Sequence, residues 1–147
     1  MTFGDKATLY VGMGDYEDMK GVKDTTGSYA LSVSNAEGRL TFKFVDADNK
    51  GEGTLSLALP KTLVKFEVDT MSEPDRGMGP PLYKEWRLTG PLSATGLFGP
   101  SMGKGQQITL IYHGGGNSCT DDTSFTHWTL VVHGPIAEYH LFGQLKQ

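Results

Sequence analysis

Two histidines and a glutamate near the end of the printed sequence have the best side chains for chemistry. His127 lies in one alternating segment, and Glu138 and His140 share a face of the next. If the Gly134-Pro135 pair is a two-residue turn, the two segments pair so that all three side chains fall on one face, within diagonal reach. Two imidazoles and a carboxylate can hold zinc or iron, or act as a general acid–base pair.

The opposite face of the same two segments argues for a simpler interpretation. It carries Trp128, Leu130 and Val132 in one segment and Tyr139 and Leu141 in the next, which is a core pattern. The histidines then lie on the outside of the fold, where isolated histidines are common. We therefore predict no metal and no cofactor, and we assign no catalytic residue.

A second motif resembles the G-x-S-x-G turn that carries the nucleophile of α/β hydrolases. It is the run Gly99-Pro100-Ser101-Met102-Gly103, and two aspartates and then three histidines follow it, namely Asp121, Asp122, His127, His133 and His140. That turn needs a strand leading into a helix within a parallel sheet. Here the run lies in a glycine-rich stretch of an antiparallel pattern, and no amphipathic helix follows. The motif therefore does not predict a hydrolase.

The elements that would position these residues are strands. In the run from Arg39 to Val45, Leu40, Phe42 and Phe44 alternate with polar residues, which is the period-two signature of a half-buried antiparallel strand. Similar runs predict nine strands in all, namely 6–11, 27–34, 39–45, 52–59, 62–69, 83–89, 106–113, 125–133 and 136–145. Sequential strands usually pair with each other, which favours an up-and-down meander.

The predicted fold is a single all-β domain over residues 1–147. It is an antiparallel up-and-down barrel or a strongly curved β-sandwich, and a barrel is preferred because closure protects the two edges of the sheet. In a simple meander, the connections at 12–26, 70–82 and 114–124 meet at one end of the barrel. Together these three segments carry a net charge of −5, by the counts −2, −1 and −2.

Composition limits the partners and the compartment. The net charge of −4 argues against nucleic acid, which requires a basic surface, and no apolar run is long enough to span a bilayer. The N-terminal residues show no secretory signal. Cys119 is the single cysteine, so an internal disulfide is excluded and a cytoplasmic location is expected. A mature secreted form with its signal removed is the alternative.

Five aromatic residues with polar groups fall on the predicted inner faces. Buried tyrosine and tryptophan need hydrogen-bond partners, and a purely packed core is built more simply from Phe, Leu and Val. A lumen lined by such residues would suit a largely apolar small molecule, although an ordinary aromatic core gives the same pattern. The predicted ligand-binding residues are Tyr29, Trp86, Tyr112, Trp128 and Tyr139.

Three function classes follow from this fold. The first is a barrel that binds a small hydrophobic molecule. The second is an isomerase or cyclase on the same frame, which holds a reactive substrate in shape and uses Tyr29, Tyr112 or Tyr139 as acid or base. The third is a structural, self-assembling subunit of a shell, fibre or tube, whose loops grip neighbouring copies and bury the loop between the first two strands and the tail 144–147. Outward-facing Ile111, Val131 and Phe142 indicate such an interface in a homo-oligomer. The sequence leaves open whether the protein is an enzyme.

Overall fold

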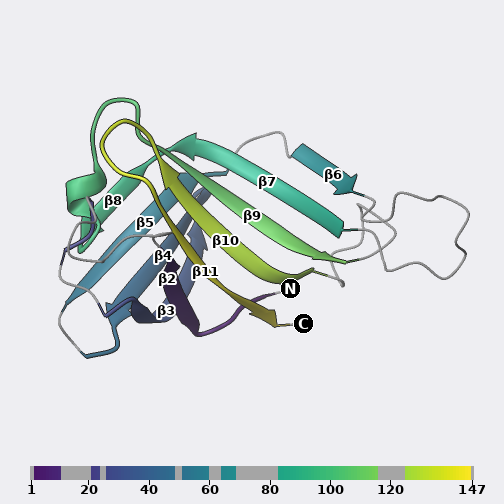
Figure 1. The fold of residues 1–147 in the computed structure, drawn as a ribbon, viewed down its shortest axis with the longest axis horizontal. Coiled ribbons are helices and arrows are strands. Elements are labelled where there is room, and N and C mark those ends of the chain that lie inside the picture. The colour runs from purple at the N-terminus through teal and green to yellow at the C-terminus, as the bar shows by residue number, and fades with distance from the viewer. Residues whose placement is uncertain are drawn as a thin grey trace, which may run out of the picture.

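The computed structural model describes residues 2–10, 21–23, 26–48, 51–59, 64–68, 83–115 and 125–146. The protein is nearly all-β, with 70% strand and 3% helix, and its strands form a nearly closed antiparallel barrel of 9 strands, as predicted. Figure 1 shows β7, β9, β10 and β11 in front of β2 to β5. The strands and one short 3-10 helix are β1 (Thr2–Phe3), β2 (Lys6–Tyr10), β3 (Ser28–Ala36), β4 (Arg39–Asp46), β5 (Glu52–Ala58), β6 (Val64–Val68), β7 (Tyr83–Pro91), β8 (Ser93–Gly96), η2 (Gly99–Ser101), β9 (Gln107–Gly115), β10 (Phe125–His133) and β11 (Tyr139–Lys146).

Alternation and turn chemistry explain why these strands form where they do. In β4, Phe42 and Phe44 are fully buried while Arg39 and Lys43 are exposed. The β3–β4 hairpin turns through Glu37 and Gly38, whose φ angles are +56° and +72°. Two consecutive positive φ values are typical of the type I′ turn, whose twist matches that of the flanking strands.

The chain departs from a simple meander after β5. Its strand order is β6-β7-β9-β10-β11-β2-β3-β4-β5-β8, so β5 pairs with β8 and not with β6. β7 and β8 are separated only by Leu92 and together form one long strand. β5 pairs with the β8 part of this strand and β6 with the β7 part, so β5 and β6 lie one after the other along it. Val64 pairs with Arg87, and Ser56 pairs with Ser93. The expected break at Pro60-Lys61 lies outside the described residues, but the strands on either side of it continue in one direction.

This continuation changes which connections share a barrel end. We define the η2 end by Tyr10, Ser28, Gly96 and His133, and the Phe3 end by the opposite strand ends. The strand ends that flank 12–26 lie at the η2 end, whereas β7 begins, β9 ends and β10 begins at the Phe3 end. The expectation that the connections at 12–26, 70–82 and 114–124 meet at one end of the barrel is therefore wrong. The connecting segments 12–20, 69–82 and 116–124 themselves lie outside the described residues.

The η2 end of the barrel is sealed by the segment that follows β8. Phe98 and Ser101 are fully buried there, and Phe98 packs against Tyr29, Phe44 and Tyr139 at ring distances of 5.1–5.9 Å. Gln106 is also buried; its amide donates to the Ala137 carbonyl at 3.1 Å.

Candidate binding site at the Phe3 end of the barrel

A change of strand partner opens the barrel wall between β1 and β3. β2 pairs with β3 only as far as Lys6 and Ala30, and the Leu31 amide donates to the Asp5 carbonyl at 2.9 Å. Beyond that point the chain leaves β3, because β1 pairs with β11 through Phe3 and Leu145. Within the described residues, the part of β3 after Leu31 has no paired strand on this side.

The resulting hollow, which we call the notch, has a volume of about 440 Å³. That volume lies in the range of about 300–1,000 Å³ that is usual for small-molecule sites. Its lining combines apolar side chains with backbone and small polar groups, and it comprises Thr2 to Asp5, residues 31–35 of β3, Leu40 and Tyr112.

The ring of Phe3 separates the notch from the aromatic core. Its centroid lies 5.1 Å from that of Phe42, 5.9 Å from that of Tyr112 and 6.0 Å from that of Trp128. Phe42 and Trp128 are fully buried, whereas Phe3 is half-buried. Phe3 therefore covers the core at the point where the barrel wall is open.

Trp128 holds a buried hydrogen-bond donor with no partner among the described residues. Its Nε1 is inaccessible to solvent and makes no hydrogen bond there. Leaving such a group unsatisfied costs about 1–3 kcal/mol, and exceptions of this kind need a physical explanation. An acceptor that reached Trp128 Nε1 would remove this cost.

Burial keeps the inward tyrosines protonated. It raises the pKa of Tyr112 to about 12. Burial also raises the pKa of Tyr139; its hydrogen bond to Ser101 opposes this effect, and the nearby Tyr29 adds to it. At neutral pH both hydroxyls are neutral and can donate or accept a hydrogen bond.

The five predicted ligand-binding residues all lie on the inner face of the barrel but fall into two groups. Tyr112 and Trp128 meet at Phe3, and Trp86 joins them through Phe125, with ring centroids 4.7 Å apart for Trp86 and Phe125. Tyr29 and Tyr139 lie under Phe98 at the sealed end. Only Tyr112 lines the notch; Tyr29 lines a separate surface hollow between β2 and β3.

Sequence reasoning missed Phe3 and the notch residues Val33 and Leu40 as parts of a site. β1 has only two residues, so no alternation marks it as a strand. Val33 and Leu40 were expected in strands, but nothing in the sequence indicates that the wall opens beside them. The one available signal was Gly4, which interrupts the apolar pattern between Phe3 and Ala7.

The G-x-S-x-G run is structural. Ser101 is fully buried, and its hydroxyl contacts the Phe98 carbonyl at 2.5 Å and the Tyr139 hydroxyl at 3.0 Å. Among the described residues, the Ser101 hydroxyl forms no hydrogen bond with a histidine. The serine therefore helps to close the η2 end rather than act as a nucleophile.

The expected grouping of His127, Glu138 and His140 is wrong because the register differs by two residues. The connection between β10 and β11 spans 134–138, so His140 pairs with Val131 and His127 pairs with Gln144. His127 and His140 are thus separated by four residues along the strand, or about 13 Å. All the same, the histidines do lie on the outer face.

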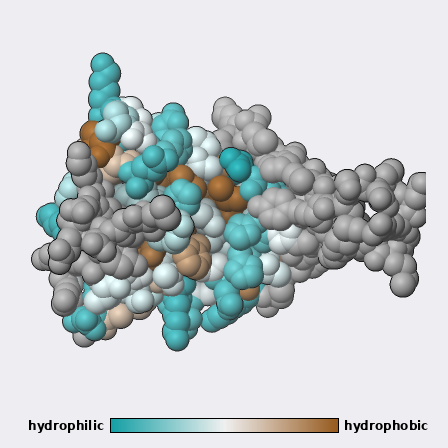
Figure 2. All heavy atoms as spheres, viewed as in Figure 1, coloured by the Kyte–Doolittle hydropathy of each residue, from teal (hydrophilic) through white to brown (hydrophobic). Residues whose placement is uncertain are grey.

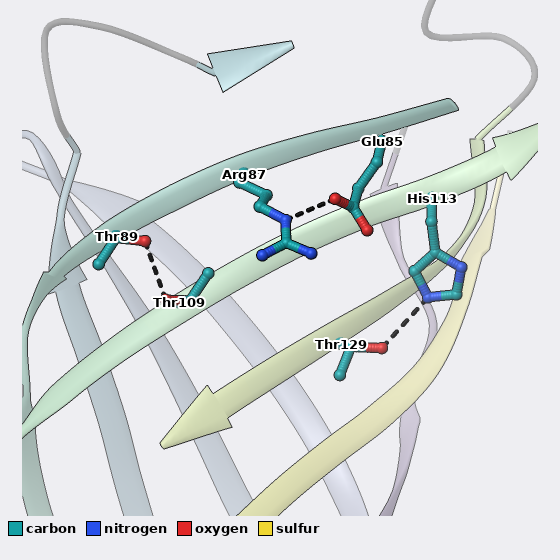
Figure 3. A network of polar contacts seen from close by, with 6 residues as sticks. All are labelled: Glu85, Arg87, Thr89, Thr109, His113 and Thr129. Atoms are coloured by element: carbon teal, nitrogen blue, oxygen red, sulfur yellow. Dashed lines mark hydrogen bonds and ion pairs between the residues drawn. The ribbon is translucent and has the colours of Figure 1, made fainter. Parts of the chain in front are cut away.

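His127 instead belongs to a row of polar residues that crosses three strands. Glu85 of β7 pairs with His113 of β9, and His113 pairs with His127 of β10. The two imidazole rings are stacked with centroids 5.7 Å apart, and His113 Nε2 contacts the Thr129 hydroxyl at 3.1 Å. Figure 3 shows His113 beside Thr129 and the Arg87 guanidinium directed at Glu85, with Arg87 Nε 2.5 Å from the Glu85 carboxylate.

Burial and two neighbouring charges act on the pKa of His113. Burial and the neighbouring His127 lower the pKa of His113, while the buried Glu85 carboxylate raises it. The net effect favours the neutral imidazole. Among the described residues, no group of three or more His, Cys, Asp or Glu side chains could hold a metal ion.

The outward apolar residues are spread over the barrel wall. Phe142 is 41% exposed, whereas Ile111 and Val131 are half-buried. Figure 2 shows brown hydrophobic groups separated by teal and white residues on the visible face. This pattern gives no continuous apolar area there on which to base an assembly interface.

Comparisons with known protein families, with curated proteins and with solved structures found no match. In the part of the chain that the structure describes, no helix has the length and hydrophobicity required to cross a membrane.

Proposed function

We propose that this protein binds a small, largely apolar molecule that carries at least one hydrogen-bond acceptor. The ligand would enter the notch between β1 and β3 and replace Phe3 against the aromatic core. The proposal depends most on one observation: the ring of Trp128, whose buried Nε1 has no partner among the described residues, packs against Phe3, and Phe3 lines a hollow of about 440 Å³.

The chemistry of the lining supports a ligand of this class. Leu40 and Val33 provide apolar contact, and Tyr112 adds a hydroxyl that is neutral at physiological pH. Ligand sites usually combine apolar walls with a few polar groups that fix orientation. An acceptor on the ligand would satisfy Trp128, while the rest of the molecule would take over the contacts of Phe3.

The tyrosine pKa values favour binding over turnover. A general base is most effective when its pKa lies near the working pH. Burial moves the pKa of Tyr112 to about 12, so its phenolate is scarce at neutral pH. Isomerase or cyclase activity is therefore the second-ranked proposal, and it would depend on confinement of the substrate rather than on a tyrosine base.

The binding proposal can be tested with N-phenyl-1-naphthylamine, a neutral apolar fluorophore. We expect saturable enhancement of its emission with the wild-type protein. Val33 lies on the inner face of β3 and lines the notch. The Val33→Trp variant should fill the notch and weaken probe binding by about tenfold or more, the equivalent of about 1.4 kcal/mol.

Val131→Trp is the matched control because the same change is made at a half-buried position on the outer face of β10. It should bind the probe as the wild type does. Equal binding by the wild type and the Val33→Trp variant would contradict a site in the notch, and absence of saturable binding by the wild type would contradict the function.

A further inference from the structure

A second hollow lies on the outer side of the barrel wall, where β11 changes partner. β11 pairs with β2 as far as Phe142 and Thr8, and with β1 from Leu145 onward. Between these pairs, the Gly4 amide donates to the Gln144 carbonyl at 2.8 Å. The step in the wall leaves a space of about 410 Å³, which we call the outer hollow.

The residues around the outer hollow are rich in hydrogen-bond donors. Lys6 and Lys146 provide ammonium groups, Gln144 provides an amide, and His127 provides an imidazole. The Thr126 hydroxyl lies 2.7 Å from His127 Nδ1. When that hydroxyl donates to Nδ1, the proton of the neutral ring is on Nε2, which is then a donor.

The charge at this place differs from that of the whole chain. Lys6 forms no ion pair among the described residues. Lys146 forms one, with its Nζ 3.9 Å from Asp5 Oδ1. Both members of that pair are largely exposed, so their attraction is weak and either can exchange partners. The lining thus carries a formal charge of +1, from Lys6, Lys146 and Asp5, in a protein whose net charge is −4.

Phe142 gives the outer hollow an apolar wall. Its side chain is 41% exposed and lies beside Thr8 across β11 and β2. An exposed aromatic ring next to lysine ammonium groups can contact a flat apolar group while the ammonium groups bind an attached anion. Charge-assisted hydrogen bonds of this kind are stronger than neutral ones.

We propose that the outer hollow binds a small organic anion in which a carboxylate is joined to a flat apolar group. The carboxylate lies between the ammonium groups of Lys6 and Lys146, and the apolar group lies against Phe142. Gln144 and His127 donate additional hydrogen bonds. This site is distinct from the notch, because the two linings share only Gly4 and Asp5, and the outer hollow does not involve Phe3, Val33 or Tyr112.

The test is a titration of the ¹⁵N-labelled full chain with sodium benzoate, followed by amide chemical shifts. We expect saturable shifts at Gly4, Gly143 and Gln144. Acetate lacks the ring, and its affinity should be lower than that of benzoate by a factor of about ten or more. The Phe142→Ser variant should lose the preference for benzoate over acetate.

A double variant, Lys6→Gln with Lys146→Gln, should weaken benzoate binding by about tenfold or more. The matched control, Lys23→Gln with Lys104→Gln, removes two exposed charges at the other end of the barrel and should bind as the wild type does. Unchanged binding by the Lys6 and Lys146 double variant would overturn the proposal. So would shifts that do not saturate, or shifts that map to Val33 and Leu40 in the notch.

Discussion

Gly143 lies directly opposite Trp128 on the inner face of the β10–β11 pair, and its lack of a side chain provides the space for the indole ring. A Cβ at position 143 would lie 2.7 Å from Trp128 Cζ2 and 2.6 Å from the Lys6 carbonyl oxygen. Neither contact can be relieved by a small side-chain movement, because one partner is backbone and the other is a fully buried ring. Gly143 therefore determines where Trp128 can lie.

The first prediction is that Gly143→Ala destabilises the protein by about 1–3 kcal/mol through overpacking. Urea denaturation measures this loss. Gly99→Ala is the control, since a Cβ there meets nothing within 4 Å, and it should change the free energy of unfolding by about 0.5 kcal/mol or less. Equal stability of the two variants would contradict the packing described for Trp128.

The second prediction concerns Phe3. Phe3→Ala removes the half-buried ring that covers Trp128, so it should lower stability by about 1–2 kcal/mol and strengthen binding of N-phenyl-1-naphthylamine. Fluorescence titration and urea denaturation measure the two effects. Tyr10→Ala, which truncates an aromatic ring that is 56% exposed, should leave probe binding unchanged. Weaker binding by Phe3→Ala would indicate that Phe3 is part of the site rather than its cover.

The third prediction is a loss of stability at high pH that depends on Tyr112. Its pKa is 10 in the unfolded chain and about 12 in the folded protein. The unfolded chain therefore loses this proton first, and stability falls as the pH rises from 10 through 12. The difference corresponds to about 2–3 kcal/mol. Urea denaturation at several pH values should show a shallower fall in Tyr112→Phe than in the wild type; parallel curves would contradict burial of the hydroxyl.

The fourth prediction concerns His113. Its pKa is lowered, so the unfolded chain takes up this proton first as the pH falls, and the contribution of His113 to stability is lost below about pH 6.5. Proton NMR of the imidazole should give a midpoint below that of a free histidine. His127→Gln removes a repelling charge and should raise the midpoint. An unchanged midpoint would show that the stacked ring does not influence His113.

The sequence predicts the barrel more completely than it predicts the site. Alternation is local, so strands such as β4, with Leu40, Phe42 and Phe44 inward, are evident from the residues alone. The register between β10 and β11 is not evident from the residues alone. It depends on how many residues form the connection between the two strands, and Gly134-Pro135 resembles a complete turn. A two-residue shift kept each histidine on the outer face but changed which residues it faces.

The position of the notch depends on long-range pairing, which has no local signature. Phe3 lies in a strand of two residues, and its importance comes from contacts with Phe42, Tyr112 and Trp128, far away in the chain. The continuity of β5 and β6 is equally hidden, since a proline between two apolar runs usually indicates a turn. The inner aromatics were predicted correctly as a face, but their division into two groups follows from the packing of Phe98.

Native mass spectrometry of the protein purified from its own source tests the central claim most directly. We expect a discrete additional mass of a small molecule on the wild-type chain, released by organic solvent. This mass should be lost from Val33→Trp and retained in Val131→Trp. A bare wild-type chain, or the same additional mass on Val33→Trp, would contradict binding in the notch.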